Sequence, residues 1–268
     1  MRVQVLASVM NQSFKDIVNR MCLDSDAVII NQCDRLGSEE MEYNGHNMRF
    51  FSFPDRGIGR SRNEAILRAD GDICLFSDED IVYSPGYASA ISDEFERNHD
   101  ADLILFNVTI AEERRTYHIS ARKRVHWYNC GRYGAVSFAV RRESLLASGV
   151  TFSLLFGGGA RYCAGEDSLF LKEFIGKGYK VYTAPVTIGR EEASGESTWF
   201  SGYNEKYFHD RGVLYRYLYG GWDRLMSLRY LLAHRDKLRG DYGLKQAYRW
   251  MWDGMKEARG GQGGGNGE

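Results

Sequence analysis

The feature that most constrains the fold is a short apolar run that ends in three acidic residues. Residues 73–76 are apolar without alternation, which is typical of a buried strand in a parallel sheet. Ligands of open α/β sheets bind outside the carboxyl ends of the strands, so Asp78, Glu79 and Asp80 would stand at a binding edge. Asp78 and Asp80 point the same way on an extended chain. Two such carboxylates suit a hard cation such as Mg²⁺ or Mn²⁺; the alternative is an acidic loop in solvent.

The segment before this strand, residues 55–72, reads as a loop, a helix, a turn and then the strand. Gly57 and Gly59 indicate the loop, and Asp70-Gly71 is a typical turn pair. Between them, residues 65–69 carry a short apolar face at helical spacing.

Strands and helices alternate along most of the chain. We expect strands at 3–9, 27–31, 48–53, 73–76, 103–108, 135–140 and 180–182, and helices at 13–21, 61–69, 85–97, 142–148 and from 165 to 176 or 178. This alternation predicts an α/β fold with a mostly parallel central sheet flanked by helices. Two amphipathic helices within 222–259 would follow as a C-terminal extension.

Three pieces of this pattern resemble the family 2 glycosyltransferases of bacterial polysaccharide assembly, which have the GT-A fold. They are the helix start Gly59-Arg60-Ser61-Arg62-Asn63, the turn Gly71-Asp72, and Asp78-Glu79-Asp80. The order and spacing are similar to those of the family, and the resemblance covers about residues 3–215. It implies an inverting, metal-dependent hexosyltransferase-type enzyme that uses a nucleoside-diphosphate sugar.

The resemblance also assigns the metal and the diphosphate. Asp80, with Asp78 close to the metal or the ribose, would hold Mn²⁺ or Mg²⁺, and Glu79 would lie in the donor pocket. Arg60 or Arg62 could assist the diphosphate, because guanidinium groups recognise phosphate in a forked geometry. A solvated helix residue is the alternative for either arginine.

An acidic pair, Glu166-Asp167, opens the helix expected after Gly165. Acidic residues are favoured at a helix start by the helix dipole, so a simple cap is one explanation. In inverting members of the family, an acidic residue of such a pair removes the proton of the acceptor hydroxyl. The resemblance therefore implies Asp167 as the general base, with Glu166 as the other candidate.

The donor nucleotide is left open by the sequence. Many relatives end the second strand with an acidic motif that contacts the base, whereas this chain has Asn31-Gln32-Cys33-Asp34. We expect Gln32 and Asp34, together with Asn11 after the first strand, to line the nucleotide pocket. A UDP-sugar is the first expectation for the donor, and a glycan or lipid-linked hydroxyl for the acceptor.

Composition excludes several other classes. The net charge of −1 carries no nucleic-acid signature, and five scattered cysteines include no Cys-x-x-Cys pair, as in proteins of a reducing compartment. No signal peptide is visible, and no apolar run reaches the about 20 residues of a membrane span. We expect a cytoplasmic protein, for which peripheral association with the inner face of the membrane is one alternative.

The domain organisation follows from these expectations. Residues 1–215 would form the catalytic domain, 216–259 the C-terminal amphipathic helices, and 260–268 a flexible glycine-rich tail. Basic residues beside two apolar stripes favour either packing on the domain or docking on an anionic bilayer. The stripes contain Leu225, Leu228, Leu231 and Leu232, and then Leu244, Ala247, Tyr248, Met251, Trp252 and Met255; the cations are Arg229, Arg235, Lys237, Arg239, Lys245, Arg249 and Lys256.

Two other functions remain compatible with the pattern. A sugar-phosphate nucleotidyltransferase also combines an α/β sheet with a metal-binding acid, but residues 8–15 lack its glycine-rich basic loop. A catalytically silent nucleotide-binding or partner-binding domain would keep the fold without turnover. A Rossmann dehydrogenase is disfavoured, because Gly57 and Gly59 do not follow the first strand.

Overall fold

The computed structural model describes residues 1–110, 117–192, 202–236 and 242–262. Within these ranges, one sheet of nine strands has the order β3-β4-β2-β1-β5-β8-β7-β9-β6. The strands are β1 (Val3–Met10), β2 (Asp26–Gln32), β3 (Gly37–Tyr43), β4 (His46–Phe53), β5 (Ile73–Asp78), β6 (Ile81–Tyr83), β7 (Leu103–Thr109), β8 (Phe138–Arg141) and β9 (Val181–Glu191). The helices are α1 (Phe14–Arg20), α2 (Ile58–Arg68), α3 (Tyr87–Arg97), α4 (Arg142–Ser148), α5 (Glu166–Gly176), α6 (Glu205–Tyr219), α7 (Asp223–Ala233) and α8 (Leu244–Gln262).

The sheet is mixed, with a parallel centre. β1 pairs in parallel with β2 and β5, and β2 pairs in parallel with β4. The strands β3, β6 and β8 run antiparallel to their neighbours. The α/β prediction is confirmed. The strands β3 and β6 were not expected from the sequence, whereas β8 was expected but not its antiparallel direction.

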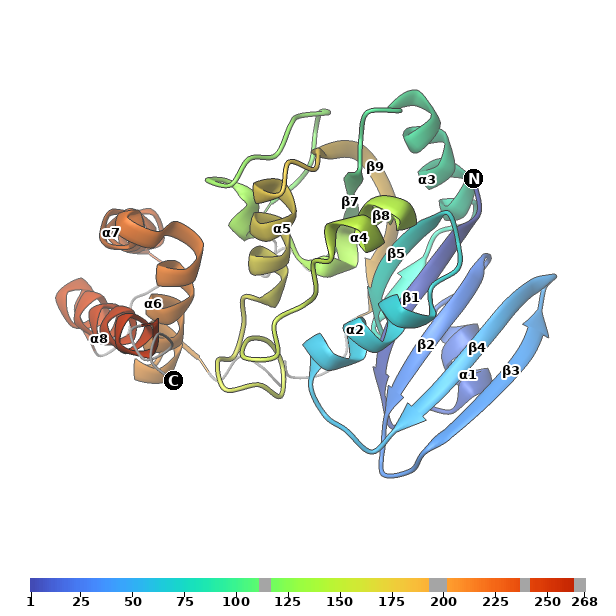
Figure 1. The fold of residues 1–268 in the computed structure, drawn as a ribbon, viewed down its shortest axis with the longest axis horizontal. Coiled ribbons are helices and arrows are strands. Elements are labelled where there is room, and N and C mark those ends of the chain that lie inside the picture. Colours follow the sequence, from blue (N-terminus) through green and yellow to red (C-terminus); the bar gives the residue numbers. More distant parts are fainter. Residues whose placement is uncertain (111–116, 193–201, 237–241, 263–268) are drawn as a thin grey trace.

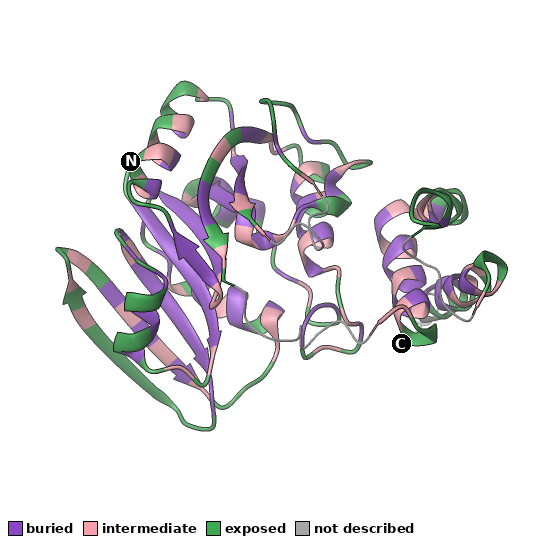
Figure 2. Cartoon of the chain, turned by 180° about the vertical axis from the view of Figure 1, so that it is seen from behind, coloured by how far each residue is buried: buried purple, intermediate pink, exposed green. Residues whose placement is uncertain are grey.

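Helices cover both faces of the sheet (Figure 1). Successive residues of β1 point to opposite faces. Val5 and Ala7 join the apolar cluster that contains α1 and α3, and Leu6 joins the cluster that contains α2, α4 and α5. The central strands are buried throughout (Figure 2), which explains their apolar sequences without alternation.

Three helices form a separate apolar cluster at the C-terminal side, where α6 lies between α5 and the pair α7 and α8 (Figure 1). The expected C-terminal helices are present as α7 and α8, and α6 precedes them. Position 215 lies inside α6, and α8 continues to Gln262, three residues beyond Arg259. Residues 263–268 of the expected tail lie outside the described part of the chain, and the division into domains stays a prediction.

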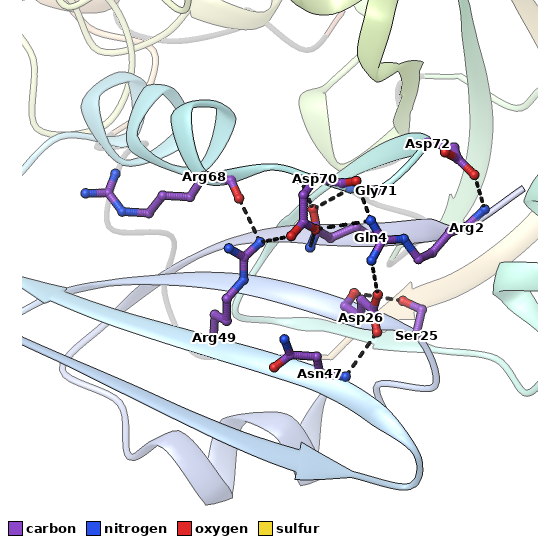
Figure 3. Close-up of polar contacts among 10 residues, drawn as sticks. All are labelled: Arg2, Gln4, Ser25, Asp26, Asn47, Arg49, Arg68, Asp70, Gly71 and Asp72. Carbon is purple, nitrogen blue, oxygen red and sulfur yellow. Dashed lines mark hydrogen bonds and ion pairs between the residues drawn. The ribbon is translucent and has the colours of Figure 1, made fainter.

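Hydrogen bonds of the turn before β5 hold the amino ends of β1 and β5 together (Figure 3). The side chain of Gln4 donates to Asp70 Oδ1 at 2.8 Å and accepts from the Asp70 amide at 2.8 Å. Asp72 Oδ2 accepts from the Arg2 amide at 2.7 Å, while the Asp72 amide donates to the Arg2 carbonyl at 2.8 Å. The Gly71-Asp72 part of the sequence pattern therefore holds strands together, and the acidic residues at 78–80 lie at the opposite end of β5.

Candidate active site

The site lies where the parallel strands β1, β2 and β5 end. Ser8 of β1 pairs in register with Asp78, the last residue of β5. Glu79 follows and turns back towards β1, where its Oε2 accepts from the Met10 amide at 2.8 Å and from Gln12 Nε2 at 3.2 Å. The acidic run is therefore an ordered strand end, and its middle residue fixes the loop after β1.

Helix α2 is tied to the site by the motif at its start. Gly59 packs so closely on the 152–153 segment that an added Cβ would overlap the carbonyl oxygen of Ser153. Ser61 Oγ donates to Ser8 Oγ at 2.9 Å. Asn63 makes a double hydrogen bond with the backbone of Phe152, at 2.8 and 2.9 Å. These contacts fix the helix so that the remaining motif residue, Arg62, points between β5 and α5.

Arg62 joins three carboxylates from two distant parts of the chain. Its Nη1 donates to Asp167 Oδ1 at 2.8 Å and to Glu166 Oε1 at 2.9 Å, and its Nη2 donates to Asp78 Oδ1 at 3.0 Å. The guanidinium lies 5.2 Å from the ring centre of Phe152, and the Arg62 side chain is only 3 % exposed. Burial lowers the pKa of Arg62, but Asp78, Asp167 and Glu166 outweigh that effect and raise it. Arg62 is thus a buried cation that holds the site together, and it is not the solvated helix residue considered as the alternative.

The two acidic residues at the start of α5 differ in access to solvent. The side chain of Glu166 is 9 % exposed, and its Oε2 also accepts from the Gly165 amide at 3.1 Å. The side chain of Asp167 is 21 % exposed. Burial and the neighbouring Glu166 raise the pKa of Asp167 well above its usual range, although Arg62 acts in the opposite direction. Asp167 is therefore the more accessible carboxylate and has a strengthened affinity for a proton.

A second carboxylate pair lies on the other side of Asp78. Burial, Asp78 and Glu191 at the end of β9 together raise the pKa of Asp80 to about 7. The Asp80 carbonyl accepts from the Glu192 amide at 2.7 Å, which joins this loop to β9. Crowded carboxylates of this kind favour either a shared proton or a cation.

The donor set here is suited to a hard divalent cation. Asp78 and Asp80 offer only carboxylate oxygens, and a cation would offset the burial and the neighbouring negative charge that raise the pKa of Asp80. Among the described residues, no group of three or more His, Cys, Asp or Glu side chains is arranged to hold a metal ion. Mg²⁺ and Mn²⁺ sites of this kind are commonly completed by substrate phosphates and water, so two protein carboxylates fit such a site.

The residues expected in the nucleotide pocket line the ends of β1 and β2. The Gln32 side chain is buried and accepts from the Gly57 amide at 2.7 Å, which ties β2 to the loop before α2. Asp34 is 95 % exposed and pairs with Arg56 at 2.9 Å. Asn11 is exposed, with a left-handed backbone (φ 51°), and its amide donates to the Gln32 carbonyl at 3.1 Å. Their roles towards a nucleotide stay predictions.

Arg60 lies apart from the carboxylate cluster. Its side chain is 49 % exposed and pairs with Asp55 at 2.6 Å. Arg60 is thus free of the buried network and accessible to solvent, whereas Arg62 is not. Whether either contacts a diphosphate stays a prediction.

Two residues of the site were not anticipated from the sequence. Glu191 was missed because the last strand was expected to end at 182, whereas β9 continues to 191. The acidic pair Glu191-Glu192 at its end is the same kind of signal as Asp78-Glu79-Asp80. Phe152, which contacts Arg62, follows a glycine-terminated helix and carries no signal of its own.

Comparison with known proteins decides the family. The sequence model of glycosyl transferase family 2 matches residues 4–149, more than half of the chain. The chain belongs to glycosyl transferase family 2. This membership confirms the resemblance, identifies the protein as a glycosyltransferase, and excludes the nucleotidyltransferase alternative. No protein of curated function matches the chain.

Solved structures of glycosyltransferases share the fold of this family 2 member. Residues 1–349 of TarS from S. aureus, in complex with UDP-GlcNAc, superpose with a TM-score of 0.57 at 13 % identity, over 95 % of this chain and 72 % of that TarS chain. The mannosyltransferase PcManGT from Pyrobaculum calidifontis, in complex with GDP-Man and Mn²⁺, gives 0.51 at 12 % identity, over 97 % of this chain and 75 % of that enzyme. At these identities the likeness establishes the GT-A fold alone.

Proposed function

We propose that the protein is an inverting, metal-dependent glycosyltransferase of surface polysaccharide synthesis. It would move a sugar from a nucleoside-diphosphate sugar, with a UDP-sugar as the first candidate, to a hydroxyl of a glycan or lipid-linked acceptor. The observation that carries the proposal is the convergence of Asp78, Glu166 and Asp167 on Arg62 at the strand ends, with Asp80 beside them. The nucleotide sugars bound by the two structural neighbours, and the Mn²⁺ bound by PcManGT, support it.

The two sides of the carboxylate cluster would divide the chemistry. Asp80 and Asp78 would hold the cation, whose positive charge offsets the charge that develops on the leaving diphosphate. Asp167 would accept the proton of the acceptor hydroxyl while that oxygen attacks the anomeric carbon. The bond from this carbon to the diphosphate breaks, and its electrons leave with the diphosphate. Attack from the face opposite the leaving group would invert the anomeric carbon.

Arg62 would serve as the positioning residue between these two sides. A base must be ionised to accept a proton, yet burial and Glu166 favour the protonated form of Asp167. The guanidinium of Arg62, 2.8 Å from Asp167 Oδ1, stabilises the ionised form of Asp167 and holds its carboxylate in one orientation. The same guanidinium also donates to Asp78, so Arg62 would orient both the proposed metal ligand and the proposed base.

Calorimetry would test the donor half of this proposal. UDP, GDP, CDP, ADP and dTDP would each be titrated with and without Mn²⁺, into the wild type and Asp80→Ala. Metal-dependent binding of one nucleotide that is lost in the variant supports the proposal, and no binding of any nucleotide contradicts it. For the accepted donor, the anomeric configuration of the product, read by NMR coupling constants, tests inversion; retention would overturn it.

A further inference from the structure

The outer face of α7 carries a row of exposed apolar side chains. Trp222, Leu225, Leu228 and Leu232 are 62, 56, 46 and 55 % exposed. Their spacing places them along one side of the helix. Leu231, which the sequence analysis grouped with these leucines, lies on the opposite side and is 1 % exposed. The apolar stripe is therefore divided between a buried face and an exposed face.

Cations border this apolar row. Arg229 and Arg235 are both exposed. Within the described residues 222–236, the acidic side chains are Asp223, which is fully buried, and Asp236, which lies 3.9 Å from Arg235. The solvent-facing side of α7 therefore combines apolar side chains with an excess of positive charge.

The inner side of α7 is held without help from the exposed leucines. Asp223 accepts from Arg259 of α8 at 2.9 Å, and the guanidinium of Arg224 stacks 4.0 Å from the ring centre of Trp252. The hydroxyls of Tyr230 and Tyr207 are 2.7 Å apart, joining α7 to α6. Most of the α7 ribbon is exposed in Figure 2, at the end of the molecule remote from the sheet (Figure 1). These contacts anchor α7 on α6 and α8, while the side chains of its outer face are exposed in the described part of the chain.

We propose that this outer face of α7 docks on an anionic lipid bilayer. A helix with leucines and tryptophan on one side and arginines along its edges suits the boundary between acyl chains and phosphate headgroups. Each arginine near an anionic surface adds about 1 kcal/mol, or roughly fivefold in affinity. A second copy of the chain fits this face less well, because two such faces would bring their arginines together.

Docking through α7 would bring the described part of the chain to a lipid-borne partner at the bilayer surface. No described helix combines the length and the apolar content that a bilayer span requires. For a lipid-linked acceptor, which rests on the proposed function, docking would hold enzyme and acceptor on the same surface. The docking itself depends on neither donor nor acceptor.

Vesicle sedimentation of the full chain tests the proposal. We expect it to pellet with vesicles containing about one third phosphatidylglycerol and to bind phosphatidylcholine vesicles much more weakly. Leu225→Gln combined with Leu232→Gln should reduce binding at least about tenfold, and Arg229→Gln roughly fivefold on anionic vesicles. Leu228→Gln should weaken binding, whereas Leu146→Gln on α4, whose side chain is equally exposed at 46 %, should not.

Three results would overturn docking through α7. They are no pelleting with anionic vesicles, equal pelleting of the wild type and the double leucine variant, and a concentration-dependent dimer in light scattering that this variant abolishes. Hydrolysis of the donor in solution, measured on the same proteins, separates this proposal from the proposed function. All the surface variants should hydrolyse the donor at the wild-type rate. If the wild type binds vesicles but hydrolyses no donor, the proposed function is contradicted and docking through α7 is not.

Discussion

The guanidinium of Arg62 donates a 2.8 Å hydrogen bond to the carboxylate of Asp167, across 105 positions of sequence. The same group holds Glu166 and Asp78, so three carboxylates share one buried cation. Buried charges are tolerated only when they are paired and hydrogen-bonded. The orientation of Asp167, the proposed base, therefore depends on a residue of α2, a helix whose motif looks like a nucleotide-binding element in the sequence.

Removing this cation should destabilise the fold. We expect Arg62→Gln to lower the free energy of unfolding by about 3–5 kcal/mol, because it leaves buried carboxylates without their partner. Urea unfolding followed by circular dichroism measures the difference. Arg60→Gln is the matched control on the same helix; its half-exposed pair with Asp55 should contribute less than about 1 kcal/mol. Equal losses in the two variants would show that Arg62 does not anchor the site.

The general base should be identified by a pair of isosteric substitutions. Asp167→Asn keeps the size of the side chain but removes its capacity to accept a proton, so we expect turnover to fall by about 10²–10⁴. Glu166→Gln should reduce turnover less, because the Glu166 side chain is less accessible and its carboxylate is committed to Arg62 and the Gly165 amide. Initial rates, with nucleotide affinity measured in parallel, distinguish the roles. The reverse order of effects, at unchanged nucleotide affinity, would assign the base to Glu166.

The close packing of α2 on the 152–153 segment predicts the effect of a single methyl group. Gly59→Ala should lower the free energy of unfolding by about 1–3 kcal/mol, because the added Cβ would overlap the Ser153 carbonyl and force the segments apart. Gly176→Ala at the end of α5 is the control, since a Cβ there meets no described atom within 4 Å. That change should be neutral or raise the free energy of unfolding by up to about 1 kcal/mol. Thermal unfolding measures the stability of both variants against the wild type. A Gly59→Ala protein as stable as the wild type would refute the packing argument.

The central strands and the helices beside them could be predicted from the sequence because each carries its own periodic pattern. The edge strand β3 could not be found in this way, since most of its residues are polar and exposed and it contains no apolar run. Its hairpin did leave a signal that was overlooked. Asn44 and Gly45, both with positive φ, form the Asn-Gly turn that is typical of two-residue hairpins.

Helix α6 was missed for a different physical reason. Gly212 lies in its middle, and glycine lowers intrinsic helix propensity. In the structure Gly212 allows α6 to cross α8 at close range, because a Cβ there would overlap the backbone carbonyl of Met251. Tertiary packing thus selects a residue that local preference disfavours. The role of Arg62 was similarly hidden, because its partners at 166 and 167 are adjacent to it only in the folded chain.

The raised pKa of Asp80 predicts a pH dependence for metal binding. A metal binds the ionised carboxylate, so below a pKa of about 7 each bound cation must displace a proton from Asp80. We expect Mn²⁺ affinity to be nearly constant above pH 7 and to fall about tenfold per pH unit below it, whereas an aspartate with an ordinary pKa near 4 would give a flat profile from pH 5 to 8. Glu191→Gln removes one of the like charges that raise the pKa of Asp80, so the inflection should move to lower pH. Calorimetry or Mn²⁺ electron paramagnetic resonance between pH 5.5 and 8 provides the profile. An inflection that stays in place in Glu191→Gln, or persists in Asp80→Asn, would mean that another group controls the metal.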